Sequence, residues 1–412
     1  MKSIRYGSGT LEKYLTTRTQ SRPERLIKKV AKIVEDVRVG GDAALLRYTR
    51  KFDRVNLQLR ELQVSEDEIN ACYQNIKPEF ASALRVAVEN VRTYYKSKIV
   101  KSLKVRTEDG VRLSEHIRPM KTVGVYVPSG TVPLVSTVYM TVIPAQAAGV
   151  QNIYIVTPPG PDGRVDPHIL AVANLLKVNA VYKAGGAQAV AAMAFGTKTI
   201  PQADKIIGPG NQYVAEAKRQ VFGYCDIDMI AGPTELVVIA NEHSDPEYVA
   251  ADLLAQSEHH GGSSILITTS KRLAKQMARL PIRGFIVRVK NLDQGVELSN
   301  RIAPEHLEIM VKSPERLLRR VENAGAVFLG PYSPTAVGDY VAGPSHVLPT
   351  NGTARFFSGL GVQDFLKNTH VISYSRKALE RVRSSAEYIA NLEGLKKHYE
   401  SIKVRFEPTR NF

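Results

Sequence analysis

The sequence predicts an α/β protein with two doubly wound, Rossmann-like halves, helices before them and a helical tail behind them. Two blocks of short apolar segments alternate with stretches of helical spacing, and Ala231-Gly232-Pro233 separates the blocks. Strands that alternate with helices of this length form parallel sheets with right-handed crossovers. Beyond about Phe365 the alternation stops, and Leu379, Val382 and Ile389 continue as an amphipathic stripe at helical spacing.

Helices are expected before the first sheet. Ser21-Arg22-Pro23-Glu24 has the pattern of a capping box with an early proline. Apolar residues then recur at helical spacing from Leu26 to Val37, and Gly40-Gly41 is expected to end this helix. Further helix is expected over 66–98, followed by turns around 107–110.

The strands of both halves are short and apolar. In the first half they are expected at 122–127, 153–156, 180–183 and 205–207. Helices are expected there over 168–178, 188–195 and 213–222. In the second half, strands are expected at 236–240, 264–268, 285–289, 307–311 and 326–329, in alternation with four helices. The first of those helices is expected over 245–260.

Composition indicates a globular protein with room for more than one domain. At 412 residues, 43% apolar and 23% charged, the chain can bury two or more cores. No apolar run reaches the roughly 18 residues that span a bilayer, and the N-terminal residues lack the apolar stretch of a secretory signal. Cys72 and Cys225 lie far apart, which argues against a disulfide framework. These features predict a cytoplasmic protein without a membrane partner.

The net charge of +16 raises the question of nucleic-acid binding, because clustered Lys and Arg neutralise phosphates. Here the basic residues are interleaved with acidic ones on amphipathic helices, as over 22–38, and no helix-turn-helix, zinc-finger or RNA-reading motif occurs. We therefore expect no nucleic-acid partner, but a solvated basic surface that can attract anionic substrates or cofactors.

Glycine-bearing corners follow three strands of the first half, at the carboxyl ends where such sheets bind ligands. They are Pro128-Ser129-Gly130, Gly185-Gly186-Ala187-Gln188 and Gly208-Pro209-Gly210-Asn211. The last two open helices, where free N–H groups favour phosphate oxygens. No Gly-x-Gly-x-x-Gly fingerprint is present, so the same corners are equally typical of tight turns in an α/β sheet.

Four residues of the second half and the tail form a candidate metal set. Gln256 and His259 are spaced i, i+3 and share one face of the expected helix. Histidine is a common zinc ligand, whereas an amide oxygen is an uncommon one. Asp339 is expected in a loop and His398 on a charged helix. Each residue also has an ordinary interpretation. Gln256 and His259 can simply lie at the exposed end of a helix, Asp339 can be a turn residue, and His398 can be a solvated surface side chain.

Glu305-His306 follows Pro304 at the start of an expected strand. A carboxylate beside an imidazole can supply two proton-transfer groups, or only a hydrogen bond at the edge of a strand. Spacing alone leaves both interpretations open.

Five long motifs lie at 123–128, 208–214, 228–235, 303–308 and 338–350. They are similar to motifs of the histidinol dehydrogenase family, and they occur in family order over nearly the whole length of the chain. The resemblance implies the oxidation of L-histidinol to L-histidine through histidinaldehyde, with two NAD⁺ used in turn and one Zn²⁺ in each active site. It also implies a homodimer in which a swapped C-terminal tail shares the active sites.

The same resemblance assigns residues to roles. It implies NAD contacts at Tyr126, Gln188 and Asn211. It implies zinc ligands at Gln256, His259, Asp339 and His398, and a catalytic pair at Glu305 and His306. Substrate contacts are implied at Thr234, Gln256, His259, His306, Asp339, Glu393 and His398, with Thr234 standing where the family often has Ser. The implied domains are 22–114 with 236–365 for zinc and catalysis, 115–235 for NAD, and 366–412 as the tail that completes the partner's site.

Three alternatives stay open at this point. A paralogue with the same zinc set could oxidise another polar alcohol, such as a sulfonated diol. A basic nucleic-acid-binding protein would contain no zinc, and a structural homologue without activity would have lost a catalytic position.

Overall fold

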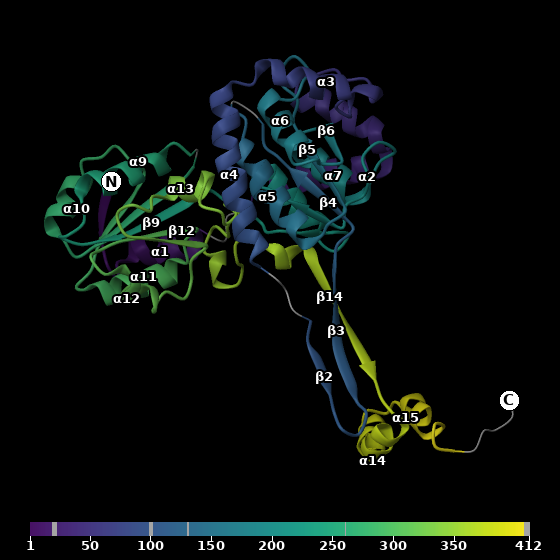
Figure 1. The fold of residues 1–412 in the computed structure, drawn as a ribbon. Coiled ribbons are helices and arrows are strands. Elements are labelled where there is room, and N and C mark those ends of the chain that lie inside the picture. The colour runs from purple at the N-terminus through teal and green to yellow at the C-terminus, as the bar shows by residue number, and fades with distance from the viewer. Residues whose placement is uncertain (19–22, 99–101, 130–131, 260, 408–412) are drawn as a thin grey trace. The chain divides into compact units, whose positions relative to one another are not determined.

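The computed structural model describes residues 1–18, 23–98, 102–129, 132–259 and 261–407 (Figure 1). Contacts between residues divide the chain into two compact units. The first unit comprises Met1–Lys98 with Met120–Phe365, and the second comprises Ile99–Pro119 with Leu366–Phe412. In the described ranges, no helix is both long enough and apolar enough to cross a membrane.

The first unit contains a five-stranded parallel sheet in the order β6-β5-β4-β7-β8. Its strands are β4 (Thr122–Tyr126), β5 (Asn152–Thr157), β6 (Ala180–Lys183), β7 (Lys205–Ile207) and β8 (Asp226–Ile227). The four expected strands are confirmed to within about a residue. Strand β8 was not expected, because two residues are too few to show an alternating pattern.

Helices α5 (Val135–Ala148), α6 (Pro167–Leu175), α7 (Gly186–Phe195) and α8 (Gln212–Val221) connect these strands. A buried core joins α7 and α8 to the sheet and to α2 (Glu24–Phe52), which precedes the sheet in the chain. The sequence analysis grouped residues 22–114 with the second half, and the packing of α2 differs from that grouping. The reason is its apolar stripe, which continues through Leu45 and Tyr48 and is buried against α7 and α8.

The glycine pair at 40–41 does not end this helix. Gly41 has φ 51° and ψ −136°, which kinks α2, and the helix continues to Phe52. The expected helix over 66–98 is instead divided into α3 (Glu66–Cys72), the 3-10 turn η2 (Tyr73–Asn75) and α4 (Pro78–Lys96). Pro78 lacks an N–H and therefore begins a helix more readily than it continues one. Ser21 and Arg22 of the expected capping box lie outside the described residues.

A second parallel sheet in this unit has six strands in the order β1-β11-β10-β9-β12-β13. They are β1 (Lys2–Arg5), β9 (Glu235–Ala240), β10 (Ser263–Thr268), β11 (Gly284–Arg288), β12 (His306–Met310) and β13 (Ala326–Leu329). The five expected strands are confirmed. The edge strand β1 was not expected, because Lys2-Ser3-Ile4-Arg5 is mostly polar and has exposed side chains.

Cores lie on both faces of the six-stranded sheet. One core joins the sheet to α1 (Gly9–Thr17), α11 (Leu292–Ile302) and α12 (Pro314–Leu318). The other joins it to α9 (Pro246–Ser257) and α10 (Lys271–Met277). Strands β9, β10 and β12 are therefore buried on both faces, as expected for parallel strands that read as continuous apolar runs.

The second unit contains a three-stranded antiparallel sheet in the order β14-β3-β2 and two helices. Its elements are β2 (Lys104–Arg106), β3 (Arg112–Pro119), β14 (Leu366–Ser373), α14 (Arg376–Leu392) and α15 (Lys396–Lys403). The amphipathic tail helix is confirmed as α14. The sheet was not expected, because its strands are largely polar and exposed and carry no apolar alternation.

Candidate active site

The Glu305-His306 pair lies at the amino end of β12, an interior strand of the six-stranded sheet between β9 and the edge strand β13. Both residues are buried, with exposed fractions of 8% and 4%. Ala303, with φ 46°, ends α11 in the left-handed conformation, and the chain enters β12 directly afterwards. The pair therefore lies at the amino edge of its sheet, opposite to the carboxyl ends at which doubly wound sheets usually bind ligands.

Both side chains are held by the backbone of one residue of the neighbouring strand. The N–H of Glu235 donates to Glu305 Oε2 at 2.9 Å, and the carbonyl oxygen of Glu235 lies 3.2 Å from His306 Nδ1. A carbonyl oxygen can only accept, so Nδ1 of His306 carries the proton in that bond. In the neutral imidazole, Nε2 is then the atom that can accept a proton.

The side chain of Glu235 is anchored from helix α1. Its Oε1 lies 3.2 Å from Arg18 Nη1, and both side chains are buried. Burial raises the pKa of Glu235 to about 7; Arg18 opposes this shift, and the nearby Glu305 carboxylate adds to it. The ion pair with Arg18 therefore fixes Glu235, whose backbone orients the side chains of both Glu305 and His306.

Gln256 lies in the last turn of α9 and is buried. Its Nε2 donates to Thr234 Oγ1 at 3.2 Å, at the entry to β9. The helix ends at Ser257 and not at residue 260, so His259 lies just beyond it, exposed, with its N–H bonded to the Gln256 carbonyl at 3.4 Å. His260 lies outside the described residues.

Asp339 lies in helix α13 (Thr335–Tyr340) and not in the expected loop. Its Oδ1 is 3.8 Å from His306 Nε2, and its carbonyl oxygen is 2.9 Å from Nδ1 of His346. Burial lowers the pKa of His346, which favours the neutral imidazole. The sequence analysis did not select His346, although it lies within the 338–350 motif.

Contacts thus connect five of the expected site residues in the first unit. Gln256 donates a hydrogen bond to Thr234. The backbone of Glu235, the next residue, bonds to Glu305 and His306, and His306 faces Asp339. Of the remaining expected zinc and substrate residues, His259 is exposed in the first unit and bonds through its backbone to Gln256, whereas Glu393 at the end of α14 and His398 on α15 are exposed in the second unit.

In the described part of the chain, no three His, Cys, Asp or Glu side chains are grouped closely enough to hold a metal ion. The expected zinc set has only two such side chains in the first unit, because Gln256 is an amide and His398 belongs to the second unit. The donor chemistry nevertheless fits a cation. The bond from Gln256 Nε2 to Thr234 leaves the amide oxygen, the atom of this group that can bind a cation, for another partner.

The three expected NAD residues lie at the carboxyl ends of the first sheet. Tyr126 ends β4, and its hydroxyl oxygen accepts the N–H of Gly186 at 3.0 Å. Gln188 is buried in the first turn of α7, where its Nε2 lies 3.5 Å from Asp53 Oδ2. Asn211 caps α8 by accepting the N–H groups of Tyr213 and Val214. Gly130 lies outside the described residues.

A buried ion pair fixes the corner at Gly208. Its N–H donates to Asp228 Oδ2 at 2.7 Å, its carbonyl accepts from Lys218 Nζ at 2.9 Å, and the two side chains pair with each other. Gly208 has φ 113°, and a Cβ here would lie 2.1 Å from the carbonyl oxygen of Tyr126. Only glycine fits such a corner. No role was expected for Lys218, Asp228 or Asp53, although Asp228 lies within the 228–235 motif, because partners distant in sequence define their roles.

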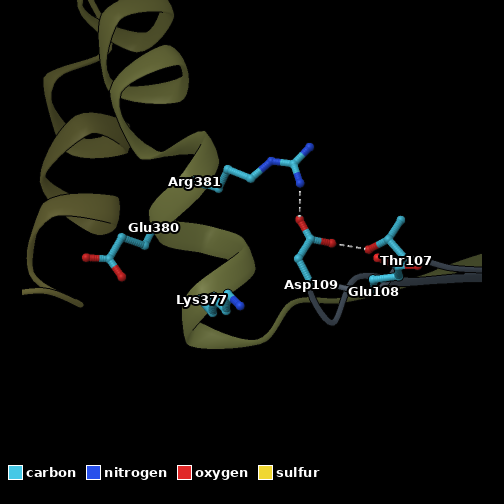
Figure 2. A pocket seen from close by; sticks show the side chains of 6 residues that line it. All are labelled: Thr107, Glu108, Asp109, Lys377, Glu380 and Arg381. Atoms are coloured by element: carbon cyan, nitrogen blue, oxygen red, sulfur yellow. Dashed lines mark hydrogen bonds and ion pairs between the residues drawn. The ribbon is translucent and has the colours of Figure 1, made fainter.

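The second unit has a surface pocket that contains none of these residues (Figure 2). It is lined by Thr107, Glu108, Asp109, Lys377, Glu380 and Arg381. Arg381 Nη1 lies 2.7 Å from Asp109 Oδ2, and Thr107 donates to the same carboxylate. These contacts tie the turn between β2 and β3 to α14, which is a structural role.

Comparison with known proteins supports the resemblance that the motifs indicate. A sequence model of the histidinol dehydrogenase family matches residues 16–406. The chain is 44% identical to a histidinol dehydrogenase of Clostridium acetobutylicum over 99% of both proteins, and 47% identical to one of Bacillus cereus over 93% of both. A crystal structure of histidinol dehydrogenase from Elizabethkingia anophelis covers 98% of both chains with a TM-score of 0.91 and 37% identity. The mixed α/β fold with parallel sheets is shared with that structure, and the chain belongs to the histidinol dehydrogenase family.

Proposed function

We propose that this protein oxidises L-histidinol to L-histidine through histidinaldehyde, with two NAD⁺ and one Zn²⁺ in each active site, as the last steps of histidine biosynthesis in the cytoplasm. Family membership supports the reaction. The observation that carries the assignment of roles is the buried Glu305-His306 pair, with His306 Nε2 facing Asp339. In the described residues nothing favours a sulfonated diol as the substrate.

The conversion of an alcohol to a carboxylate needs proton acceptors at two stages. At the first stage, His306 Nε2 takes the hydroxyl proton as a hydride leaves the carbon. At the second, Glu305 takes a proton from the water that adds to the aldehyde. As water adds, His306 returns its proton to the aldehyde oxygen, which becomes a hydroxyl of the hydrate. Neutral again, His306 accepts a hydroxyl proton of the hydrate as the second hydride leaves. NAD⁺, when bound, accepts one hydride at each stage.

The geometry suits this division of labour. The Glu235 N–H bonds to one oxygen of Glu305 and so restrains the position of the carboxylate. The Glu235 carbonyl directs the proton-accepting nitrogen of His306 away from the strand. Two groups held by one backbone keep a constant separation, which general acid–base catalysis requires.

Gln256, His259 and Asp339 would hold zinc together with His398 of a second copy of the chain. Zinc, when bound, would supply a Lewis acid that orients the imidazole and amine of the substrate. Thr234 and Glu393 would contact the substrate, together with Gln256, His259, His306, Asp339 and His398. Tyr126, Gln188 and Asn211 would bind NAD at the carboxyl ends of the first sheet, where such folds bind nucleotides.

We further propose a homodimer of doubly wound, Rossmann-like halves with a swapped tail. The NAD half would be 115–235, the zinc and catalytic half 22–114 with 236–365, and the tail 366–412, with the exception that α2 packs against the NAD half. Helix α14 supports this arrangement, because Tyr388 and Leu392 are 70% and 75% exposed. Apolar side chains of this size are usually covered, and a partner subunit would cover them.

Removal of zinc should abolish activity. We expect chelation to stop NADH formation and added Zn²⁺ to restore it. We expect His259→Ala to lose both stoichiometric metal, measured by elemental analysis, and turnover. His243→Ala, at another exposed histidine, is the matched control and should keep both. A His259→Ala protein with full metal content and full turnover would contradict the assignment.

Replacement of Glu305 should separate the two half-reactions. Glu305→Gln keeps the shape of the side chain but cannot take a proton from water, so we expect alcohol oxidation to be retained. The aldehyde-to-acid half should fall by about 10²–10⁴-fold, the usual contribution of a positioned acid or base. Single-turnover NADH formation with histidinol and with histidinal measures each half, and the exposed Glu315→Gln is the control. Equal small losses in both halves would refute the assignment.

Subunit mixing tests the shared active site. The His398→Ala and His259→Ala proteins should each be inactive. In a dimer with one chain of each kind, one active site carries both substitutions and the other active site carries neither. After random exchange of equal amounts we expect about a quarter of the wild-type activity, because half of the dimers are mixed and each has one intact site. Each variant exchanged with itself is the control. If labelled subunits exchange and no activity returns, the tail acts within its own chain.

A further inference from the structure

The three elements that carry the proposed site residues of the second half meet at one buried acid. Glu308 lies on β12, two residues after His306, and is 1% exposed. Its Oε1 accepts both the N–H and the hydroxyl of Thr335, each at 2.9 Å. Thr335 is the first residue of α13, the helix that carries Asp339. One oxygen of Glu308 therefore joins β12 to the start of α13.

A second acid lies beside Glu308, whose other oxygen lacks an ordinary donor in the described ranges. Oε2 is buried and has no ordinary donor among the described groups, whereas the side chain of Asp252 is within hydrogen-bonding reach of Glu308. Two ionised carboxylates only accept hydrogen bonds, so they cannot bond to each other. One proton placed between them supplies the missing donor.

The electrostatics agree with this geometry. Burial is the largest cause that raises the pKa of Glu308, and the nearby Asp252 carboxylate raises it further. Burial also raises the pKa of Asp252. Raised pKa values of a buried Glu308 and a half-buried Asp252 are the usual result when two carboxyl groups share a site.

Asp252 connects this pair to the proposed zinc site. The buried residues of α9 are Val249, Leu253 and Gln256, which form the face that packs on the sheet. Asp252 lies beside that face, one helical turn before Gln256. A bond between Asp252 and Glu308 therefore fixes the rotation and the axial position of the turn that ends in Gln256.

We propose that Asp252 and Glu308 share one proton and act as a positioning pair, which holds Gln256 on α9 and Asp339 on α13 in register with the Glu305-His306 end of β12. The inference rests on the proposed function, because the residues it positions are the proposed ligands and substrate contacts. Neither acid touches the reacting atoms in this account. Residues that orient ligands from behind typically change metal affinity or activity by about 10–100-fold when replaced.

Paired substitutions at Asp252 test this role in the full-length protein. Asp252→Asn keeps the shape and supplies an N–H to Glu308 without a shared proton, so we expect nearly wild-type zinc affinity and KM for L-histidinol. Asp252→Ala removes the donor, and we expect zinc affinity, measured by competition with a chromophoric chelator, to fall by about 10–100-fold. KM should rise more than kcat falls. Glu247→Ala, an exposed acid of the same helix, should change none of these values.

Infrared spectroscopy tests the shared proton without any need for turnover. The spectrum of the wild-type protein at neutral pH, minus that of the double variant Asp252→Asn/Glu308→Gln, should show the carbonyl stretch of a protonated carboxyl group that the wild type alone carries. A band from Glu235, whose pKa is about 7, is common to both proteins and cancels in this difference. Absence of the band from the difference spectrum, or equal zinc affinity in Asp252→Ala and Asp252→Asn, would overturn the proposal. If the wild type fails to oxidise L-histidinol, the proposed function is wrong. The infrared band and the zinc affinities still test whether Asp252 and Glu308 share a proton and position the proposed zinc ligands.

Discussion

The parallel pairing of β9 with β12 is the constraint on which the candidate site depends. Its register places His306 opposite Leu236, so Glu235 presents its N–H to Glu305 and its carbonyl to His306. A shift of one residue would turn the side chains of a strand to the other face of the sheet. The register is secured by apolar side chains of both strands, which are buried in separate cores on the two faces. The packing that stabilises the sheet therefore also orients the proton-transfer groups Glu305 and His306.

Two buried ion pairs of the first unit hold backbone that positions proposed site residues. Lys218 and Asp228 bond to both backbone groups of Gly208, and Arg18 pairs with Glu235 behind the catalytic candidate. Buried ion pairs of this kind add little net stability, because removing charges from water is costly, but they define one geometry. One pair fixes the corner at Gly208, beside the proposed NAD contacts. The other fixes the strand end at Glu235, beside the proposed catalytic residues.

Much of the fold could be predicted because its strands are short, apolar and separated by clear helical stretches. Nine expected strands are confirmed, whereas β1, β8 and the strands of the second unit were missed, since they are short or polar and gain their order from their neighbours. Gly40-Gly41 was misjudged because the apolar stripe of α2 resumes after the kink. The site residues were selected by resemblance, since spacing left each one ambiguous. Partners such as Arg18, Lys218 and Glu308 could not be found, because no local pattern indicates which distant residue a buried charge will meet.

The most direct test of the proposed reaction is its electron count. L-Histidinol in limiting amount, incubated with the zinc-loaded protein and excess NAD⁺, should yield two NADH and one L-histidine for each molecule consumed, and a sulfonated diol should yield none. A yield of one NADH with accumulation of histidinaldehyde, or turnover of the sulfonated diol in place of L-histidinol, would contradict the account.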